Sequence, residues 1–358
     1  MKILYYISGY DGCGYYRVQL PAKLLNKIPG ITAKIASQYD NNDINWADIV
    51  VIQKQTNERA LPYVRYAREH GKKVISEVDD CYFNLPTWNP AYNYYRNLGK
   101  ELITFYRLSN SMTVTTDYLK KELDKYNPNI FVLPNSLDIE FQEKLEKMSE
   151  EELNLYTRYI DVNQKNLSLV EVKEFLKDKT TIGWGGSPTH LRDLDQATDA
   201  LVKICSEDKN IIVVMMSCST DTILKKINPK QLLLVKPSPI FRYHQVLTSM
   251  SWDIGICPIE ENEFNKSKSN LKFLEFSVNG YACVCSDVEN YTKTVKHGET
   301  GLLTKNTVES WYENLKILID SPQLRKTISA TAKKFVKENF NIEKNVSLWH
   351  DAYKEVLK

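Results

Sequence analysis

The chain has 358 residues, which is long for one hydrophobic core and suits two domains of about 170 residues each. Its 47 Lys and Arg residues against 45 Asp and Glu leave a formal net charge of +2, which excludes a global field attracting nucleic acid or an anionic membrane. With 42% hydrophobic and 26% charged residues, the composition is typical of a folded soluble protein.

The seven cysteines are scattered without a CxxC pair. This pattern predicts reduced thiols and a cytoplasmic location. The opening residues, MKILYYISGYDG, predict a strand rather than a signal peptide, and no apolar run reaches transmembrane length. Peripheral contact with a membrane is left open.

Strands alternate with helices in the pattern of the first 138 residues. The expected strands are 2–8, 30–37, 48–53, 73–77, 111–115 and 129–133, and the expected helices are 15–27, 60–70, 97–108 and 118–125. This alternation predicts an α/β unit with a parallel, doubly wound sheet.

Two loops of this first half carry candidate site residues. The loop after the first strand holds Gly9, Gly12 and Gly14, whose spacing is not the GxGxxG of a dinucleotide site. Asp79 and Asp80 follow a strand at its carboxyl end, where open α/β sheets bind ligands. These two acids could orient an acceptor hydroxyl or act as a base, and a helix-capping turn is the alternative. They lack the intervening residue of a metal-binding DxD, so no metal is predicted.

Residues 139–178 are charged with recurring apolar positions, which predicts a helical connector or insertion. A second alternating set follows. Its expected strands are 180–184, 211–217, 232–235, 253–258 and 281–285, and its expected helices are 193–205, 243–250, 308–319, 323–339 and 342–357.

The turn after the first strand of this second set is rich in small residues. Its backbone amides at Gly185, Gly186 and Ser187 could cradle an anion, with His190 or Arg192 adding positive charge. The alternative is a tight turn with a solvated arginine.

Residues 264–303 are the most informative stretch. A polar, cation-rich loop leads into a short helix with one acid, Glu275, and the amino end of a helix suits a phosphate. If Ser269 or Asn270 caps that helix, the acid shares a face with two lysines, Lys268 and Lys272.

The rest of that helix is apolar, so Glu275 is expected to be buried and to need a partner. A pair of ligand hydroxyls would be one partner. Lys272, three residues earlier, is the alternative.

The order KS-x-x-K-x-x-E, then Gly280, Ser286-Asp287-Val288 and V-x-x-G-x-x-G-L-L, resembles the nucleotide-sugar site of retaining GT-B glycosyltransferases, the group 1 or family 4-like type of bacteria and phages. The resemblance implies that Glu275 holds the ribose hydroxyls of the donor. It also implies that the loop and helix start hold the diphosphate and the sugar. These residues are Lys268, Ser269, Asn270, Leu271 and Lys272. The family often has a second Glu where this chain has Ser267.

The resemblance implies two Rossmann-like domains, with the last helix crossing back onto the first. The domains would be 1–138 with 341–358, a connector 139–178, and 179–340. The candidate catalytic residues are then Asp79, Asp80 and Glu275. The further donor-binding candidates are Gly12, Gly14, Arg17, Gly185, Gly186, Ser187, His190 and Arg192. Arg17 would face the cleft, or would be a solvated helix residue.

The implied activity is transfer of a sugar from a nucleoside-diphosphate sugar to an acceptor hydroxyl with retention, without cofactor or metal. A cell-envelope glycan is the first expected acceptor. A phage-type transferase acting on modified DNA bases or a virion component is an alternative, although the near-neutral charge does not favour nucleic acid. A sugar-nucleotide epimerase and a non-catalytic sugar-nucleotide-binding subunit also stay open, the latter because of Ser267.

Overall fold

The computed structural model describes residues 1–54, 59–149, 151–153, 160–162 and 165–358. They fall into two compact units. Unit 1 comprises Met1–Asp138, Asn262–Ser269 and Phe340–Lys358, and unit 2 comprises Ile139–Glu261 and Asn270–Asn339. Unit 1 is therefore built from three separate parts of the chain.

Unit 1 contains a six-stranded sheet in the order β2-β1-β3-β4-β5-β6, with every pair parallel. The bounds are β1 Lys2–Tyr6, β2 Thr32–Ala36, β3 Ile49–Gln53, β4 Lys73–Val78, β5 Ser111–Val114 and β6 Ile130–Val132. The strand order reverses between β1 and β3. Such a reversal leaves a crevice at the carboxyl ends of the two strands, where α/β proteins bind ligands.

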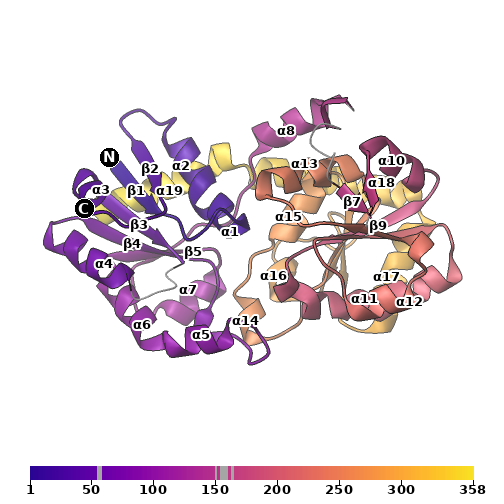
Figure 1. Cartoon of the computed structure of the whole chain (residues 1–358), viewed down its shortest axis with the longest axis horizontal. Helices are drawn as coiled ribbons and strands as arrows, with labels where there is room; N and C mark the ends of the chain where they lie inside the picture. Colours follow the sequence, from indigo (N-terminus) through magenta and orange to yellow (C-terminus); the bar gives the residue numbers. More distant parts are fainter. Residues whose placement is uncertain (55–58, 150, 154–159, 163–164) are drawn as a thin grey trace. The chain divides into compact units, whose positions relative to one another are not determined.

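The helices of unit 1 lie between these strands and in the two later segments (Figure 1). They are α1 Gly12–Gly14, a π-helical turn Tyr15–Gln19, α2 Leu20–Leu25, α3 Asn41–Trp46, α4 Ala60–Glu69, a 3-10 turn Tyr82–Asn84, α5 Tyr92–Asn97, α6 Gly99–Leu108, α7 Asp117–Leu123, α14 Glu263–Lys266 and α19 Ile342–Leu357.

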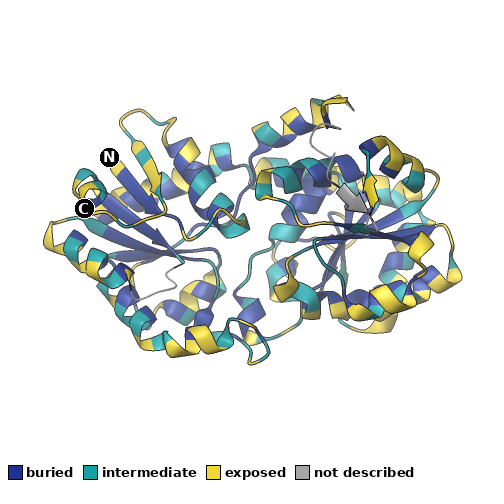
Figure 2. Ribbon diagram, in the orientation of Figure 1, coloured by how far each residue is buried: buried dark blue, intermediate teal, exposed yellow. Residues whose placement is uncertain are grey.

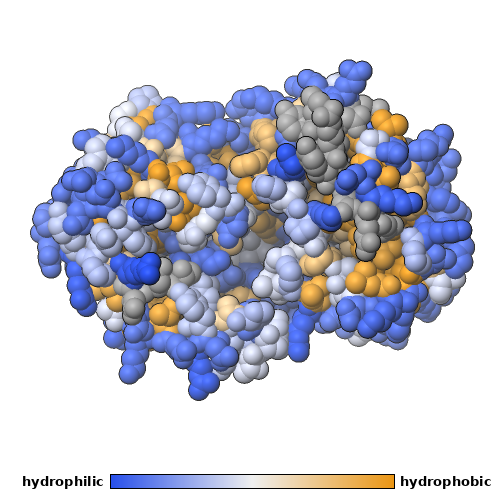
Figure 3. Space-filling view, in the orientation of Figure 1, coloured by the Kyte–Doolittle hydropathy of each residue, from blue (hydrophilic) through white to orange (hydrophobic). Residues whose placement is uncertain are grey.

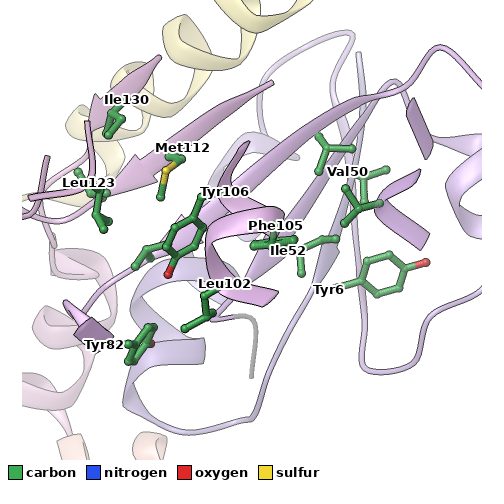
Figure 4. Packing of buried hydrophobic residues seen from close by; sticks show 14 of the residues in the cluster. Tyr6, Val50, Ile52, Tyr82, Leu102, Phe105, Tyr106, Met112, Leu123 and Ile130 are labelled. Atoms are coloured by element: carbon green, nitrogen blue, oxygen red, sulfur yellow. The ribbon is translucent and has the colours of Figure 1, made fainter. Parts of the chain in front are cut away.

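The core of unit 1 forms because its inner strands are apolar on both sides, as a parallel sheet covered by helices requires. All five residues of β3 are buried. Phe105 and Tyr106 of α6 pack against the strand residues Ile52 and Met112 in one cluster (Figure 4). Figure 2 shows the same division, with buried strands and exposed outer sides of helices.

Helix α19 belongs to unit 1, as the expected crossing-back of the last helix requires. The backbone amide of Leu137 donates to Phe340 O at 2.7 Å, and the amide of Ile342 donates to Leu137 O at 2.9 Å. The hydroxyl of Tyr5 in β1 donates a hydrogen bond to the hydroxyl of Tyr353 in α19 at 3.0 Å. Figure 1 shows α19 beside α2.

Unit 2 contains an eight-stranded sheet in the order β14-β13-β12-β9-β10-β11-β7-β8. Six strands are parallel, and the hairpin β7-β8 adds antiparallel at the β11 edge. The bounds are β7 Ile160–Val162, β8 Lys165–Leu167, β9 Thr180–Gly185, β10 Ile211–Met216, β11 Leu232–Val235, β12 Ile254–Cys257, β13 Ala282–Ser286 and β14 Leu302–Thr304. The parallel strands follow the Rossmann order, with its reversal between β9 and β12.

Helices cover both faces of this second sheet (Figure 1). They are α8 Ile139–Lys147, α10 Leu169–Leu176, a 3-10 turn Pro188–His190, α11 Leu191–Glu207, α12 Asp221–Lys226, a 3-10 turn Pro229–Gln231, α13 Ile240–Met250, α15 Leu271–Val278, α16 Glu289–Thr292, α17 Val308–Asp320 and α18 Pro322–Asn339.

The stretch 139–178 differs from the helical expectation, because it also carries the two strands of the hairpin. Each strand has three residues and no extended apolar alternation, so no periodic signal marks it. The stretch belongs to unit 2, and Gln142 of α8 donates to Asn279 Oδ1 at 2.9 Å there.

Hydrophilic residues cover most of the face drawn in Figure 3. Within the described ranges, no helix is long and apolar enough to cross a membrane.

Candidate functional site

The strand reversal of unit 2 brings several of the predicted residues together. Strand β9 ends at Gly185, and the turn Gly185-Gly186-Ser187 follows at the carboxyl edge of the sheet. The chain leaving β12, the other strand at the reversal, leads to α15, which carries Lys272 and Glu275. A ligand in the crevice expected at this reversal would meet both.

Lys272 joins these two segments. Its ammonium donates to Gly185 O at 2.9 Å and lies 5.5 Å from the centre of the Trp184 ring. A Cβ placed on Gly186 would lie 2.8 Å from the Trp184 ring and 3.1 Å from Lys272 Nζ. Gly186 therefore leaves the space in which the lysine and the tryptophan meet.

Glu275 lies on the same helix, one turn further on, and is 6% exposed. Its Oε2 accepts a hydrogen bond from the Tyr243 hydroxyl at 3.0 Å. Burial raises the pKa of Tyr243 well above its ordinary value, and the nearby carboxylate of Glu275 adds to the rise. The hydroxyl therefore stays protonated and donates to the acid. The expected burial of Glu275 is confirmed, and a protein partner that the sequence did not predict is at its side.

Helix α15 begins at Leu271, with Asn270 as its N-cap residue. The Asn270 side chain makes no capping hydrogen bond to the first turn, and its amide nitrogen donates to Thr294 Oγ1 at 2.8 Å. Neither Ser269 nor Asn270 therefore caps in the predicted way. Lys268 precedes the helix, so the predicted helical face with Lys272 and Glu275 does not include it.

The other candidates of unit 2 lie just beyond the glycine turn. Ser187 is exposed, and its hydroxyl lies 2.7 Å from Thr189 Oγ1. His190 Nδ1 lies 2.7 Å from Asp193 Oδ2, and the other oxygen of Asp193 accepts from the amide of Glu260 at 2.9 Å. This acid thus holds the imidazole at the start of α11.

Arg192, the second residue of α11, is exposed, as the alternative of a solvated arginine requires. The proposed contact of Arg192 and His190 with a donor phosphate stays a prediction.

The glycine loop of unit 1 follows β1 at the strand reversal of that sheet. Asp11 caps α1 by accepting from the amide of Gly14 at 2.8 Å. A Cβ on Gly14 would lie 1.9 Å from Gly9 O, so close backbone packing requires this glycine. A Cβ on Gly12 would have no described heavy atom within 4 Å. Packing thus explains one of the two candidate glycines.

Arg17 is neither solvated nor directed to a ligand, and both expectations for it are wrong. Its side chain is 1% exposed and forms a bidentate pair with Glu77, at 2.7 and 3.2 Å. Its third nitrogen donates to Leu133 O at 2.5 Å and to Asn135 Oδ1 at 3.1 Å. All three nitrogens of the guanidinium therefore bond inside unit 1, and its burial keeps it from a phosphate.

The two candidate acids Asp79 and Asp80 follow β4 and are partly exposed. Asp79 Oδ1 accepts from the Tyr82 hydroxyl at 3.1 Å, and Asp80 Oδ1 lies 3.8 Å from Lys268 Nζ. Burial raises the pKa of Asp80, and the negative charge of Asp79 raises it further. The positive charges of Lys268 and Lys54 act against this rise. These acids and lysines gather at the carboxyl edge of the sheet.

The segment Asn262–Ser269 is fastened to unit 1 at several points. Phe264 packs into the core, and Ser267 is fully buried. The Ser267 hydroxyl donates to Phe264 O at 2.6 Å and accepts from the amide of Cys81 at 3.1 Å. Ser269 Oγ accepts from Asn135 Nδ2 at 2.9 Å. Ser267 therefore has a packing role that a glutamate could not fill.

The predicted site residues did not include three that the structure places at these sites: Tyr243, Lys54, and Asn135 in its contact with Ser269. The sequence signal for Lys54 was its place directly after the expected strand 48–53; in the structure it follows β3 at the strand reversal of unit 1, with a φ of 48°. Tyr243 and Asn135 are long-range partners without a local signature. Among the described residues, no group of three or more His, Cys, Asp or Glu side chains is arranged to hold a metal ion.

Comparison with proteins of known structure identifies the fold. No family model and no curated protein sequence matches the chain. A glycosyltransferase from Rickettsia africae matches in structure with a TM-score of 0.67 at 15% identity, over 100% of this chain and 98% of the other.

Two further solved structures match over nearly their whole length. HepE from Anabaena, in complex with UDP and glucose, has a TM-score of 0.68 at 11% identity, over 99% of this chain and 100% of that chain. A sucrose-phosphate synthase from Thermosynechococcus elongatus has a TM-score of 0.67 at 11% identity, over 99% and 98%. The chain has the GT-B fold of these proteins, and the predicted fold class is confirmed.

Proposed function

We propose that the chain is a glycosyltransferase that moves a sugar from a nucleoside-diphosphate sugar to an acceptor hydroxyl, with retention at the anomeric carbon. The observation that carries this proposal is the contact of Lys272 of α15 with the Gly185-Gly186 turn at the strand reversal of a GT-B unit, with Glu275 one turn further along the same helix. The fold supports it, because HepE, a structural neighbour, is described in complex with UDP-glucose.

The proposed role of each residue in unit 2 follows from its chemistry. The ammonium of Lys272 and the backbone amides that open α15 would stabilise the diphosphate as negative charge grows on it during departure. Glu275, oriented by Tyr243, would accept hydrogen bonds from the ribose hydroxyls. Unit 2 is therefore the proposed donor-binding unit.

Unit 1 is the proposed acceptor-binding unit. Asp79 and Asp80 at the carboxyl edge of its sheet would accept hydrogen bonds from acceptor hydroxyls. A cell-envelope glycan is the proposed acceptor class. The seven free cysteines support the proposed cytoplasmic location, because reducing compartments keep thiols unpaired.

A non-catalytic sugar-nucleotide-binding subunit is the second candidate. The specific observation in its favour is Ser267, which is buried and engaged by backbone where related enzymes often have a glutamate toward the sugar. A subunit of this kind would bind the donor without turning it over.

Calorimetry and product analysis separate these functions. The protein is titrated with UDP, GDP, ADP and dTDP, and then incubated with the matching nucleotide sugars with and without glycan acceptors. Binding plus nucleotide release that rises with an acceptor supports the transferase, and NMR of the product anomer tests retention. Binding without release supports the subunit, and binding of none of the four nucleotides overturns both.

Glu275→Gln is the matched variant, because it keeps the shape of the side chain and removes its charge. Its affinity for the bound nucleotide should fall roughly tenfold, the usual loss of hydrogen bonds to a charged group. Glu289→Gln, at the exposed start of α16, is the control and should bind like the wild type.

A further inference from the structure

A line of hydrogen bonds, buried except at its half-buried end at Ser269, runs through unit 1 from the sheet to the segment that precedes α15. Glu77 of β4 holds Arg17 through two contacts, and the Thr113 hydroxyl donates to Glu77 Oε2 at 2.5 Å. Arg17 then donates to Asn135 Oδ1 at 3.1 Å, and Asn135 Nδ2 donates to Ser269 Oγ at 2.9 Å. The line links five residues, at positions 17, 77, 113, 135 and 269, that lie far apart in sequence.

The hydrogen-bonding chemistry of its partner Arg17 fixes the orientation of the Asn135 side-chain amide. A guanidinium can only donate, so Asn135 must turn its oxygen toward Arg17. Its amide nitrogen is thereby directed to Ser269. Asn135 is 7% exposed and Arg17 is 1% exposed, so both side chains are held before any ligand arrives. The contact to Ser269 is therefore preorganised.

Ser269 is the last residue of the segment in unit 1 and directly precedes Asn270, the N-cap residue of α15. The backbone from Ser269 leads directly into α15, whose opening amides, at Leu271 and Lys272, are those to which the proposed function assigns the diphosphate. A fixed Ser269 restrains these amides through the covalent chain. A loosened Ser269 would let them leave the geometry that a phosphate requires.

We infer that Asn135 is a positioning residue, which Arg17 orients and which sets the phosphate-binding backbone at Ser269–Lys272. The inference rests on the proposed function for its ligand, but its geometry is independent of it. Ser267 has its own bonds to Cys81 and Thr116, the latter from Thr116 Oγ1 to Ser267 O at 3.0 Å. Loss of the Asn135 contact should therefore loosen residues 269–272 and leave 264–267 unchanged.

The chain offers a matched control. Asn127 is another buried asparagine of unit 1, 4% exposed, and its amide donates to Tyr106 O and Ser109 O at 2.9 Å each. Asn127→Ala removes a comparable set of hydrogen bonds without touching the line to Ser269. A merely structural loss would affect both variants alike.

The first measurement is hydrogen exchange of the unliganded protein. Asn135→Ala and Ser269→Ala should accelerate exchange of the amides of residues 269–272, and Asn127→Ala should not. Equal exchange in Asn135→Ala and wild type, or the same acceleration in Asn127→Ala, overturns the inference. This arm needs no nucleotide, so failure of the proposed function cannot be mistaken for failure of the positioning role.

The second measurement is UDP affinity by calorimetry. Asn135→Ala should weaken UDP binding roughly two- to tenfold, the range for one hydrogen bond between neutral groups, and the double variant with Ser269→Ala should weaken it no further. Additive losses would overturn the coupling. Wild-type protein that fails to bind UDP while the exchange pattern holds would remove UDP as the donor nucleotide and leave the positioning role standing.

Discussion

The hydroxyl of Tyr243 donates to Glu275 Oε2 at 3.0 Å, with the acid only 6% exposed. This contact supplies the partner that a buried carboxylate needs, and it points one oxygen in a fixed direction before a ligand arrives. The tyrosine thus belongs to the proposed ribose site although it does not have to touch the ribose.

Tyr243→Phe should weaken UDP binding roughly three- to tenfold, because the carboxylate loses the hydrogen bond that orients it. Calorimetry measures the change. Tyr281→Phe is the control, since the Tyr281 hydroxyl is buried in the same unit and donates to Leu247 O, away from Glu275. Equal losses in the two variants would show that only the fold had been weakened.

Gly186→Ala should displace Lys272. The added methyl would lie 2.8 Å from the Trp184 ring and 3.1 Å from Lys272 Nζ, and overpacking of this kind costs about 1–3 kcal/mol. UDP affinity should fall roughly tenfold. Gly99→Ala, at the start of α6 with no described heavy atom within 4 Å of the new carbon, should leave affinity unchanged. Wild-type affinity in the Gly186→Ala protein would contradict the proposed role of Lys272.

Glu77→Gln should destabilise unit 1 by about 3–5 kcal/mol, because it leaves the buried guanidinium of Arg17 without its counter-charge. Urea unfolding followed by circular dichroism measures the change. Thr113→Val removes only one hydroxyl contact to the same acid and should cost about 1–2 kcal/mol. A Glu77→Gln variant no less stable than Thr113→Val would contradict this, and would mean that water solvates the Arg17 guanidinium once the carboxylate is lost.

Asp80→Asn should change how stability depends on pH. Burial raises the pKa of Asp80 in the folded state, so the folded protein holds this proton more tightly than the unfolded chain. The contribution of Asp80 is therefore fully present at low pH and is lost as pH rises from about 3.9, the unfolded value, through the higher folded value. The wild type should lose stability relative to Asp80→Asn across that window.

Thermal unfolding across the acidic range up to neutral pH tests this sign. Asp117→Asn, at the start of α7 in the same unit, is the control for a change of one charge. A wild type that gains stability relative to Asp80→Asn as pH rises would show that Lys268 and Lys54 outweigh burial.

The sequence predicted most of the fold because long periodic segments carry their own signal. The bounds of α19 and β11 agree with the expectation at both ends, and the alternation of strands and helices gave the parallel sheets. The short elements β7, β8, α12 and α14 were missed, because three to six residues contain too little periodicity to separate them from loops.

The site was predicted in part. Lys272 does contact the Gly185-Gly186 turn, with Glu275 one turn further along the same helix, because strand ends at a reversal are brought to one place by topology. Arg17 was misjudged for the opposite reason. Its burial depends on Glu77, which is sixty residues away, and on Asn135, and no local pattern reports such a partner. Ser267 shows the same limit, since its hydroxyl is held by the backbone of Cys81.

Unit 1 takes its last helix from Phe340–Lys358, so a ribosome has made all of unit 2 before the first sheet receives Trp349 and Tyr353. Trp349 is fully buried and lies 5.5 Å from the guanidinium of Arg17. During translation the strands of unit 1 are made before the helix α19 that packs against them, whereas every residue of unit 2 has been made once Asn339 is added. Unit 1, which begins the chain, can therefore complete its core only after unit 2 has been synthesised.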